Sequence, residues 1–599
     1  MTSSQLLSRR DLDFLLYEWL GTEGLAARER FAEHSRDTFD AMLDLAGEIA
    51  AERFAPINRL LDAEEPRIGP DGRVVHPAGL AEALRAYADS GMPSATFAPE
   101  LGGMRVPFTV AQAAFAYFQA ASVGASAYPL LASAGANLLV AHGTEDQIER
   151  FARPIIEGRW YGTMCLSEPQ AGSSLGDITT RAVAQDDGTY RLFGTKMWIS
   201  GGDHDLSENI VHLVLARTPG APAGVKGISL FIVPKVLVRP DGSLGERNDV
   251  ALAGLNHKMG YRGTTNTLLN FGEGQARPGG AAGAVGHLVG AEGRGLACMF
   301  HMMNEARVTV GLGAVALGYT GYLHALAYAR ERTQGRPAGG KDAAAPMVPI
   351  IDHPDVRRML LAQKAYVEGG LALSLYCARL IDDRASGDEA ARRRAHDLLE
   401  VLTPIAKSWP SQWCLTANDL AIQVHGGYGY TRDYAVEQFY RDNRLNPIHE
   451  GTHGVQGLDL LGRKVVAGSG AGLRLLVETL RATTGRARAA GGEAAAYAGM
   501  LDPAIDRLAE VTGVLWTDGD PAVALANASV YLEAAGHVVV AWIWLEQLLA
   551  VSGDDAFAEG KRAAARYFFR YELPKTSPQF DLLAARDRTT LDLDPAVLG

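Results

Sequence analysis

Basic residues, paired cysteines and long uncharged apolar runs are all scarce in this chain of 599 residues. Its 57 Lys and Arg face 69 Asp and Glu, which gives a net charge of −12, whereas nucleic-acid-binding domains usually carry a basic face. We therefore do not expect nucleic acid as a partner. Four cysteines lie far apart with no C-x-x-C spacing, which argues against a disulfide framework and a structural zinc site and fits a reducing compartment. They are Cys165, Cys298, Cys377 and Cys414.

Neither a targeting segment nor a membrane span is recognisable. The opening MTSSQLLSRRDLDFLLYEWLG (1–21) has acids inside its apolar part and lacks a signal-peptide cleavage region. The most apolar run, VVVAWIWLEQLLAV (538–551), contains Glu546 and is short for a membrane helix. We expect a buried helix at 538–551 and a cytoplasmic protein.

Hydrophobic content of 47% and charged content of 21% are ordinary for globular proteins, and the length is too great for a single core. Helical spacing of apolar residues dominates both ends of the chain, and short β-branched runs dominate the part between them. The patterns predict an α+β protein with four domains and no internal repeat. We expect a helical domain at 1–160, a β-domain at 161–290, a helical domain at 291–467 and a further helical domain at 468–599.

Strands are predicted from runs that alternate or are rich in β-branched residues and are separated by Gly, Pro and Asp turns. The predicted strand runs are YRLFGTKMWIS (190–200), IVHLVLART (210–218), GISLFIVPKVLV (227–238) and TNTLLNF (265–271).

The segment HEGTH (449–453) has the letters of the zinc-protease pattern H-E-x-x-H. That pattern binds zinc only when both histidines lie on one face of a regular helix. Pro447 and Gly451 argue against a helix, because Gly costs about 1 kcal/mol and Pro about 3 kcal/mol in a helix interior. Where the extended zinc pattern needs Gly and His, this chain has Gln456 and Asp459. We therefore do not expect a metal site.

Two stretches of the β-domain could hold a ligand. MCLSEPQAGSSLGDITTRA (164–182) offers hydroxyls and backbone N–H groups that suit a polar planar ligand or a phosphate, and it could equally be a Gly/Ser turn between strands. In KMWIS (196–200) Trp198 and Ser200 share one strand face. They could cover and hydrogen-bond an aromatic ring system, or Trp198 could belong to the core.

Together with QVHGGYGY (423–430) and HEGT (449–452), these stretches resemble the acyl-CoA dehydrogenase family, over about residues 11–466 and in the family's order. The opening RRDLDFLLYEWLG (9–21) and the extra C-terminal domain look like the long subgroup. This subgroup includes 3-methylmercaptopropionyl-CoA dehydrogenases and large fatty acyl-CoA dehydrogenases. The resemblance implies an FAD-dependent enzyme that converts an acyl-CoA to a trans-2-enoyl-CoA and passes electrons to electron-transfer flavoprotein.

The resemblance also implies roles for single residues. Leu166 and Ser167 match the positions that hold the flavin pyrimidine edge, Trp198 matches the residue that shields the flavin ring, and Ser200 matches the hydroxyl at flavin N5. Arg332 and Gln334 match a segment that reaches the FAD of a neighbouring subunit, which implies a homodimer. The remaining cofactor positions are Ser173, Gln423, Gly426, Gly427 and Thr452, and the substrate positions are Ser173, Asn304, Arg307 and Gly451.

Glu450 matches the family's catalytic base. Removing a proton α to a thioester requires a carboxylate in a site emptied of water, where its pKa rises. Some relatives place the base directly before the residue that matches Arg307, where this chain has Ala306. Glu305 stands one residue further back, about 100° around the helix, and reads more simply as a solvated charge.

The chain departs from the family pattern at three positions. Ser174 replaces an acid, Gln438 replaces a basic residue and His449 replaces the common Tyr before the glutamate. Two other functions keep the same fold, namely an acyl-CoA oxidase and a flavin-bearing DNA-associated protein. The C-terminal PAVLG is not a peroxisomal address, and the C-terminal domain holds more acids than bases, so we favour the dehydrogenase. The acyl group is not predicted.

Overall fold

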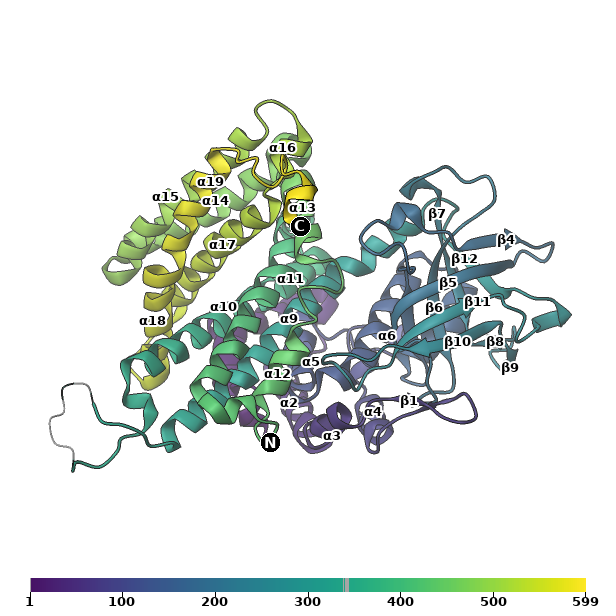
Figure 1. The fold of residues 1–599 in the computed structure, drawn as a ribbon, viewed down its shortest axis with the longest axis horizontal. Helices are drawn as coiled ribbons and strands as arrows, with labels where there is room; N and C mark the ends of the chain where they lie inside the picture. The colour runs from purple at the N-terminus through teal and green to yellow at the C-terminus, as the bar shows by residue number, and fades with distance from the viewer. Residues whose placement is uncertain (1, 338, 340–343) are drawn as a thin grey trace. The chain divides into compact units, whose positions relative to one another are not determined.

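The computed structural model describes residues 2–337, 339 and 344–599, apart from the side chains of residues 3 and 301–304. The chain folds into two compact units (Figure 1). Unit 1 comprises residues 44–106 and 117–306, and unit 2 comprises residues 2–43, 107–116 and 307–599. The division falls inside three helices, α2, α5 and α9, whose bounds are Arg36–Ile49, Phe108–Ala121 and Gly295–Glu331.

Unit 1 holds the main β-sheet, with the strand order β10-β11-β5-β12-β7-β6-β3 and β4 paired with β5 and β6. Strands β5, β6 and β11 confirm three of the predicted runs, whereas the run 227–238 is divided into β7 of this sheet and β8, which pairs with β9 in a separate two-stranded sheet. The bounds are β1 Arg67–Ile68, β2 Val74–Val75, β3 Tyr161–Cys165, β4 Arg181–Ala184, β5 Tyr190–Ser200, β6 Ile210–Arg217, β7 Ile228–Pro234, β8 Val236–Val238, β9 Leu244–Arg247, β10 Val250–Leu255, β11 Asn266–Phe271 and β12 Ala284–Val289.

The helices of unit 1 precede the main sheet in the chain, except for the start of α9, which follows it. They are α3 Asn58–Ala63, α4 Leu80–Asp89, α6 Val123–His142, α7 Glu145–Gln147 and α8 Arg153–Ile156, together with parts of α2, α5 and α9. Helix α6 packs directly on β3, because a side-chain carbon at Gly162 would lie only 3.5 Å from the Ala132 backbone. The predicted α+β fold is confirmed.

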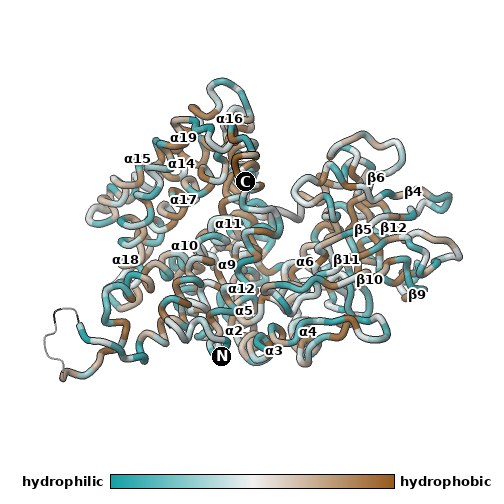
Figure 2. The backbone as a smooth tube through the Cα atoms, in the orientation of Figure 1, coloured by the Kyte–Doolittle hydropathy of each residue, from teal (hydrophilic) through white to brown (hydrophobic). Residues whose placement is uncertain are grey.

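Unit 2 is helical. Besides its parts of α2, α5 and α9, its helices are α1 Arg9–Asp13, α10 Pro354–Ser386, α11 Glu389–His425, α12 Val436–Asn443, α13 His453–Asp459, α14 Ala467–Ala490, α15 Gly492–Leu515, α16 Pro521–Leu525, α17 Ala528–Ala550, α18 Ala556–Tyr567 and α19 Thr576–Ala584. Figure 2 shows both hydrophobic and hydrophilic residues along most of these helices, as expected for helices with one buried and one exposed face.

Glycine allows the long helices of unit 2 to approach closely. A side-chain carbon on Gly311 of α9 would lie 2.0 Å from the Ala406 carbonyl oxygen of α11, which is too short for any real contact. The two backbones therefore touch at this point, one turn after Arg307 and beside Lys407.

Buried charges fasten the N-terminal segment and the last helices to the bundle. Lys561 of α18 forms ion pairs with Asp11 of α1 and, at 2.9 Å, with Glu368 of α10. Tyr319 of α9 donates a hydrogen bond of 3.0 Å to Asp11. The ammonium and the two carboxylates are almost fully buried, so removing one partner would leave an uncompensated charge in the core.

The expected buried helix at 538–551 is confirmed as part of α17, but α17 has 23 residues and is longer than the apolar run alone. By length and composition, α17 and two other described helices could cross a membrane, namely Val123–His142 and the Glu305–Glu331 part of α9. In this fold 83% of the α17 window and 67% and 78% of the other two windows are buried inside the protein.

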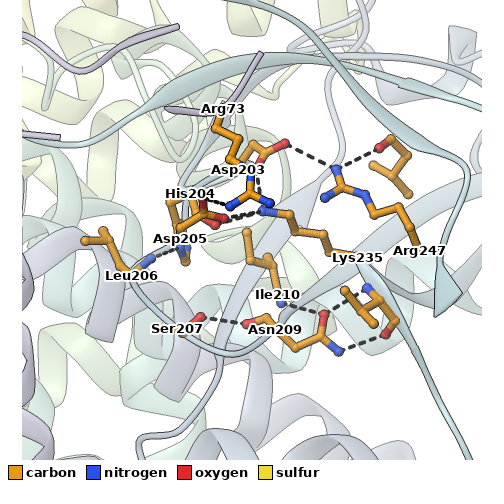
Figure 3. A network of polar contacts seen from close by, with 12 residues as sticks. Arg73, Asp203, His204, Asp205, Leu206, Ser207, Asn209, Ile210, Lys235 and Arg247 are labelled. Carbon is orange, nitrogen blue, oxygen red and sulfur yellow. Dashed lines mark hydrogen bonds and ion pairs between the residues drawn. The ribbon is translucent and has the colours of Figure 1, made fainter. Parts of the chain in front are cut away.

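A polar network fixes the loop that follows β5 (Figure 3). Lys235 Nζ donates to Asp203 Oδ1 at 2.6 Å and to the His204 carbonyl oxygen at 2.8 Å. Asn209 Oδ1 accepts from the N–H groups of Ile210 and Val236, both at 2.9 Å. These contacts bind the loop to the start of β6 and to the end of β7.

Beside this loop lies a cluster of neutral histidines. His204 packs edge-on against Tyr128 and His76, with ring centroids 5.4 Å and 6.4 Å apart. Burial lowers the pKa of His76 to about 4, although Asp205 and Asp203 oppose this shift and Lys235 adds to it. Burial also lowers the pKa of His204 far below its usual value.

We predict that this cluster makes unit 1 sensitive to acid. The unfolded chain binds a proton at His76 near pH 6.5 and the folded chain only near pH 4, so the stabilisation is complete above pH 6.5 and is lost as the pH falls toward 4. His76→Phe should remove up to about 3 kcal/mol of that loss. Urea unfolding at several pH values measures the free energy of unfolding, and replacement of the exposed His396 by Gln is the control. If the free energy of unfolding of His76→Phe falls between pH 6.5 and pH 4 as steeply as that of the wild type, the prediction is contradicted.

Candidate active site

The predicted flavin-edge residues Leu166 and Ser167 lie in the loop after β3, and this loop is tied to β5. Lys196 Nζ donates to the Leu166 carbonyl oxygen at 3.0 Å and to Glu168 Oε1 at 3.0 Å. The Met197 N–H donates to the Ser167 carbonyl oxygen at 3.0 Å. Strand β5 therefore sets the position of the loop that carries both predicted residues.

Glu168 is the central acceptor of this arrangement. It accepts hydrogen bonds from the N–H and hydroxyl groups of Thr179 and Thr180, at distances between 2.6 and 3.0 Å. Burial raises the pKa of Glu168, but Lys196 and these hydrogen bonds outweigh burial and lower the pKa to about 2. Glu168 and Lys196 form a buried ion pair, which the sequence analysis did not identify.

Trp198 is not part of the core. Trp198 is 59% exposed. Its φ of 67° lies in the left-handed region of backbone conformation, which residues other than glycine rarely adopt. This excludes the core interpretation and leaves the indole face open to a ligand. Ser200 accepts a hydrogen bond from Asn266 Nδ2 at 3.4 Å. Ser173 is exposed on the loop, and its neighbour Ser174 donates to Asp177 Oδ2 at 2.5 Å.

In unit 2, four predicted cofactor residues from distant parts of the chain line one open pocket of about 810 Å³. They are Arg332, Gln334, Gly426 and Gly427. Gln423 lies on the last turn of α11, where its carbonyl oxygen accepts from the Gly426 N–H. Gly426 has φ 60°, and no atom lies within 4 Å of the place where its side chain would be, so ligand atoms can approach the backbone.

The walls of this pocket suit a nucleotide-like ligand. Tyr328 stacks on His425 with ring centroids 4.3 Å apart, and Arg332 Nη2 donates to Gln334 Oε1 at 2.5 Å. His353 Nε2 donates to the Gln334 carbonyl oxygen at 2.7 Å. The pocket thus combines a positive charge, open backbone and aromatic faces, the groups that phosphates and a purine ring need.

Glu450 lies in the loop between α12 and α13, not in a helix, with φ 53°. Gly451 follows with φ 90°. Gln456 Nε2 donates to the Glu450 carbonyl oxygen at 3.1 Å, and Thr452 caps α13 by accepting from the Val455 N–H. The expected non-helical loop is confirmed.

The other side of the loop rests on buried amides. His449 Nε2 donates to Asn446 Oδ1 at 2.9 Å, and Asn446 Nδ2 donates to Asn443 Oδ1 at 2.8 Å. Asn443 in turn donates to Asn418 Oδ1 on α11 at 2.7 Å. Because this chain of hydrogen bonds is buried, it holds the loop in one conformation.

Lys407 is the functional candidate that the sequence analysis missed. It is fully buried on α11, and its Nζ donates to the carbonyl oxygens of Asn446 and Gly451, each at 2.7 Å. The signal in the sequence is a lone charge in TPIAKSWPSQW (403–413). No chemistry could be assigned to it without knowing which loop packs against α11.

The electrostatics of Glu450 suit a base. Burial raises its pKa, and the charges of Lys407 and Arg307 oppose that shift. Arg307 is 4% exposed and forms an ion pair of 3.0 Å with Asp459 Oδ2. Burial lowers the pKa of Lys407 to about 7, although Glu450 raises it. The three groups therefore influence one another.

The two histidines of HEGTH do not share a helix face. His449 lies before α13 and bonds to Asn446, whereas His453 begins α13 with its Nε2 3.8 Å from Glu533 Oε1. Within the residues that the structure describes, no group of three or more His, Cys, Asp or Glu is arranged to hold a metal ion.

Two predicted residues on α9 need separate comment. The side chain of Asn304 lies outside the described residues. Glu305 is partly buried and accepts a hydrogen bond of 3.4 Å from Asn137. Glu305 is therefore partly covered within unit 1, and its interpretation as a solvated charge stays a prediction.

Family models match the chain from residue 36 to residue 594. They are the N-terminal domain (36–159), middle domain (163–273) and C-terminal domain (293–465) of acyl-CoA dehydrogenase and an acetyl-CoA dehydrogenase C-terminal-like domain (476–594). The chain is an oxidoreductase of the acyl-CoA dehydrogenase family, whose cofactor is FAD.

Among its relatives is the 3-methylmercaptopropionyl-CoA dehydrogenase of Ruegeria pomeroyi, 39% identical over 95% of this chain and 96% of that protein. The broad-specificity linear acyl-CoA dehydrogenase FadE5 of Mycobacterium tuberculosis is 34% identical over 98% of both chains. The fold is shared with Caenorhabditis elegans ACDH-11 in complex with C11-CoA, with a TM-score of 0.77 and 18% identity over 96% and 92% of the chains.

We predict that the Lys196–Glu168 pair is essential to the flavin-edge loop. Lys196→Met leaves a buried carboxylate without its counter-charge, which costs about 3–5 kcal/mol, and it also frees the Leu166 carbonyl oxygen. Stability in urea and FAD content should both fall. Adding Glu168→Gln should restore part of the stability, because the amide is neutral.

The matched control is Lys226→Met, which removes an exposed lysine of the same unit. If Lys196→Met is as stable and binds FAD as tightly as this control, the pair does not support the loop.

Proposed function

We propose that the protein catalyses the FAD-dependent α,β-dehydrogenation of an acyl-CoA thioester to a trans-2-enoyl-CoA, with Glu450 as the base. The observation that carries this proposal is the placement of one partly buried carboxylate in a loop fixed on both sides, with its pKa raised by burial. A carboxylate with a raised pKa is a stronger base than one with an ordinary pKa. Removal of a proton from the α-carbon of a thioester requires such a base.

The loop also offers a donor for the thioester oxygen. Among the hydrogen bonds of the described residues, none is donated by the Glu450 N–H. A backbone N–H aimed at the thioester oxygen would stabilise the enolate that forms when the α-proton leaves. Gly451 next to it has no side chain to obstruct the acyl group.

Bound FAD would supply the hydride acceptor, at N5, for the hydrogen that leaves the β-carbon. Residues of each unit fit parts of this cofactor. In unit 1 the exposed Trp198 face and the Leu166–Ser167 loop suit a flavin ring system, and in unit 2 the pocket lined by Arg332 and Gly426 suits phosphates. The chain's own part is to bind the cofactor, exclude water and move the α-proton.

The relatives support the substrate class. Two of them act, by name, on 3-methylmercaptopropionyl-CoA and on linear acyl-CoAs. We propose a CoA thioester for this chain as well, with Arg307, Asn304 and Ser173 near the CoA arm. We further propose electron-transfer flavoprotein as the electron acceptor, a role in fatty-acid β-oxidation and a cytoplasmic location.

A homodimer is the predicted assembly, because Arg332 and Gln334 match residues that reach the FAD of a neighbouring subunit. Light scattering of the yellow holoenzyme should give a mass near twice that of one chain. Arg332→Glu should lower FAD content, since it places a like charge beside the phosphates. A monomer that retains FAD would contradict the dimer.

Glu450→Gln tests the function directly. The amide keeps the size of the side chain but cannot accept the proton, so flavin reduction by acyl-CoA should fall by about 10²–10⁴-fold. Folding, FAD content and binding of enoyl-CoA should change little. Stopped-flow bleaching of the flavin under anaerobic conditions measures the rate.

Glu305→Gln is the matched control and should cost little, because Glu305 faces Asn137. Fast flavin reduction by Glu450→Gln would show that the base lies elsewhere.

A further inference from the structure

Lys407 is buried in the middle of the helical bundle, where a charged side chain is unusual and requires an explanation. It lies on α11 between Pro404 and Pro410, and its side chain is fully buried. Placing an ammonium group in such surroundings is costly unless the group is paired and hydrogen-bonded. Lys407 forms no ion pair within 4.0 Å among the described side chains.

The partners of Lys407 are instead two carbonyl oxygens of the loop that carries Glu450. Nζ donates to Asn446 on one side of Glu450 and to Gly451 on the other, each at 2.7 Å. One amine thereby links the two ends of the segment that contains Glu450. This matters because Glu450 has a φ of 53°, a conformation that is unfavourable for a non-glycine residue and persists only when its surroundings impose it.

We propose that Lys407 is a positioning residue for Glu450, which fixes its loop through two hydrogen bonds and keeps its carboxylate ionised through its positive charge. The inference rests on the proposed function only in calling Glu450 the base. The hydrogen bonds and the charge act on Glu450 whatever reaction it serves.

The titratable groups around Lys407 and Glu450 come from helices α9, α13 and α17 and from the loop itself. Arg307 of α9 is offset by Asp459 of α13. His449 and His453 flank Glu450 in the chain, and burial, with Lys407 adding to it, lowers the pKa of His453 to about 4, so His453 is neutral near pH 7. Glu533 of α17 lies near His453, 3.8 Å away. Of the two cations that act on Glu450, Arg307 is paired with a carboxylate, whereas Lys407 forms no ion pair with the described side chains.

Titration agrees with the geometry. The positive charge of Lys407 opposes the rise that burial gives the pKa of Glu450. In return Glu450 raises the pKa of Lys407, which burial lowers to about 7. Lys407 therefore holds its proton below about pH 7, the range in which a carboxyl group with a raised pKa changes charge.

Two variants separate the effect of the two hydrogen bonds from the effect of the positive charge. Lys407→Gln keeps two N–H donors but has no charge, and Lys407→Arg keeps the charge. The readout is the pH titration of the Glu450 carboxyl band by infrared difference spectroscopy of the holoenzyme, assigned by its absence in Glu450→Gln. An opposite charge nearby lowers a carboxyl pKa by about 1–3 units, so the Gln variant should titrate about 1–3 pH units higher.

Lys407→Arg should titrate near the wild-type pH. Lys464→Met is the matched control, because it removes a lysine that pairs with Glu400 elsewhere on α11 and should leave the band unchanged. The acid limb of the pH profile for kcat/KM should move with the band in Lys407→Gln. Titration of Glu450 at the wild-type pH in Lys407→Gln would overturn the proposal.

The wild-type protein gives a second measurement that does not depend on a folded variant. As Lys407 loses its proton near pH 7, the Glu450 carboxylate band should shift with an inflection at that pH. A band that shows no inflection there would equally overturn the proposal. If instead Glu450 titrates as expected but Glu450→Gln still reduces its flavin, the proposed function fails and the role of Lys407 stands.

Discussion

A carboxylate in a partly buried, strained loop has to be held in place by its surroundings, and in this protein the loop around Glu450 is held by buried hydrogen bonds. The free energy that favours a φ near 53° must come from contacts outside the residue. Lys407 of α11 donates two of these hydrogen bonds and Gln456 of α13 donates one, while Asn446 Oδ1 accepts one from His449. Both donors lie on helices, so the position of Glu450 depends on the packing of the bundle.

The flavin-edge loop of unit 1 is built on the same principle. A buried lysine, Lys196, donates to the Leu166 carbonyl oxygen and to the Glu168 carboxylate. In both units an amine on a regular element fixes the backbone of a loop that carries chemistry, while the side chains of that loop remain available to a ligand. Lys196 has a counter-charge in Glu168, whereas Lys407 donates only to carbonyl oxygens, and burial lowers the pKa of Lys407 to about 7.

The additional C-terminal domain takes part in this support. A side-chain carbon on Gly457 of α13 would lie 2.7 Å from the Ala528 carbonyl oxygen at the start of α17, so α13 packs directly on that domain. Lys561 of α18 binds Asp11 and Glu368, which belong to the N-terminal segment and to the bundle. Helix α13, which begins three residues after Glu450, thus rests on the start of α17.

The sequence predicted most of the elements and only part of the site. Strand β5 runs from Tyr190 to Ser200 as the alternation of YRLFGTKMWIS indicated, and Pro447 and Gly451 predicted a loop at Glu450. Local pattern could not decide whether Trp198 is core or exposed, because exposure depends on what packs against the strand. Local pattern also could not find Lys196 or Lys407, because the partners of both lysines are set by tertiary packing.

The central claim, that Glu450 removes the α-proton, can be measured apart from the redox step. Holoenzyme with its flavin already reduced is incubated with acyl-CoA in D₂O without oxygen, and deuterium in the recovered thioester is located by mass spectrometry. The account predicts deuterium at the α-carbon and not at the β-carbon, with the exchange lost in Glu450→Gln. Exchange at the wild-type rate in Glu450→Gln would contradict it.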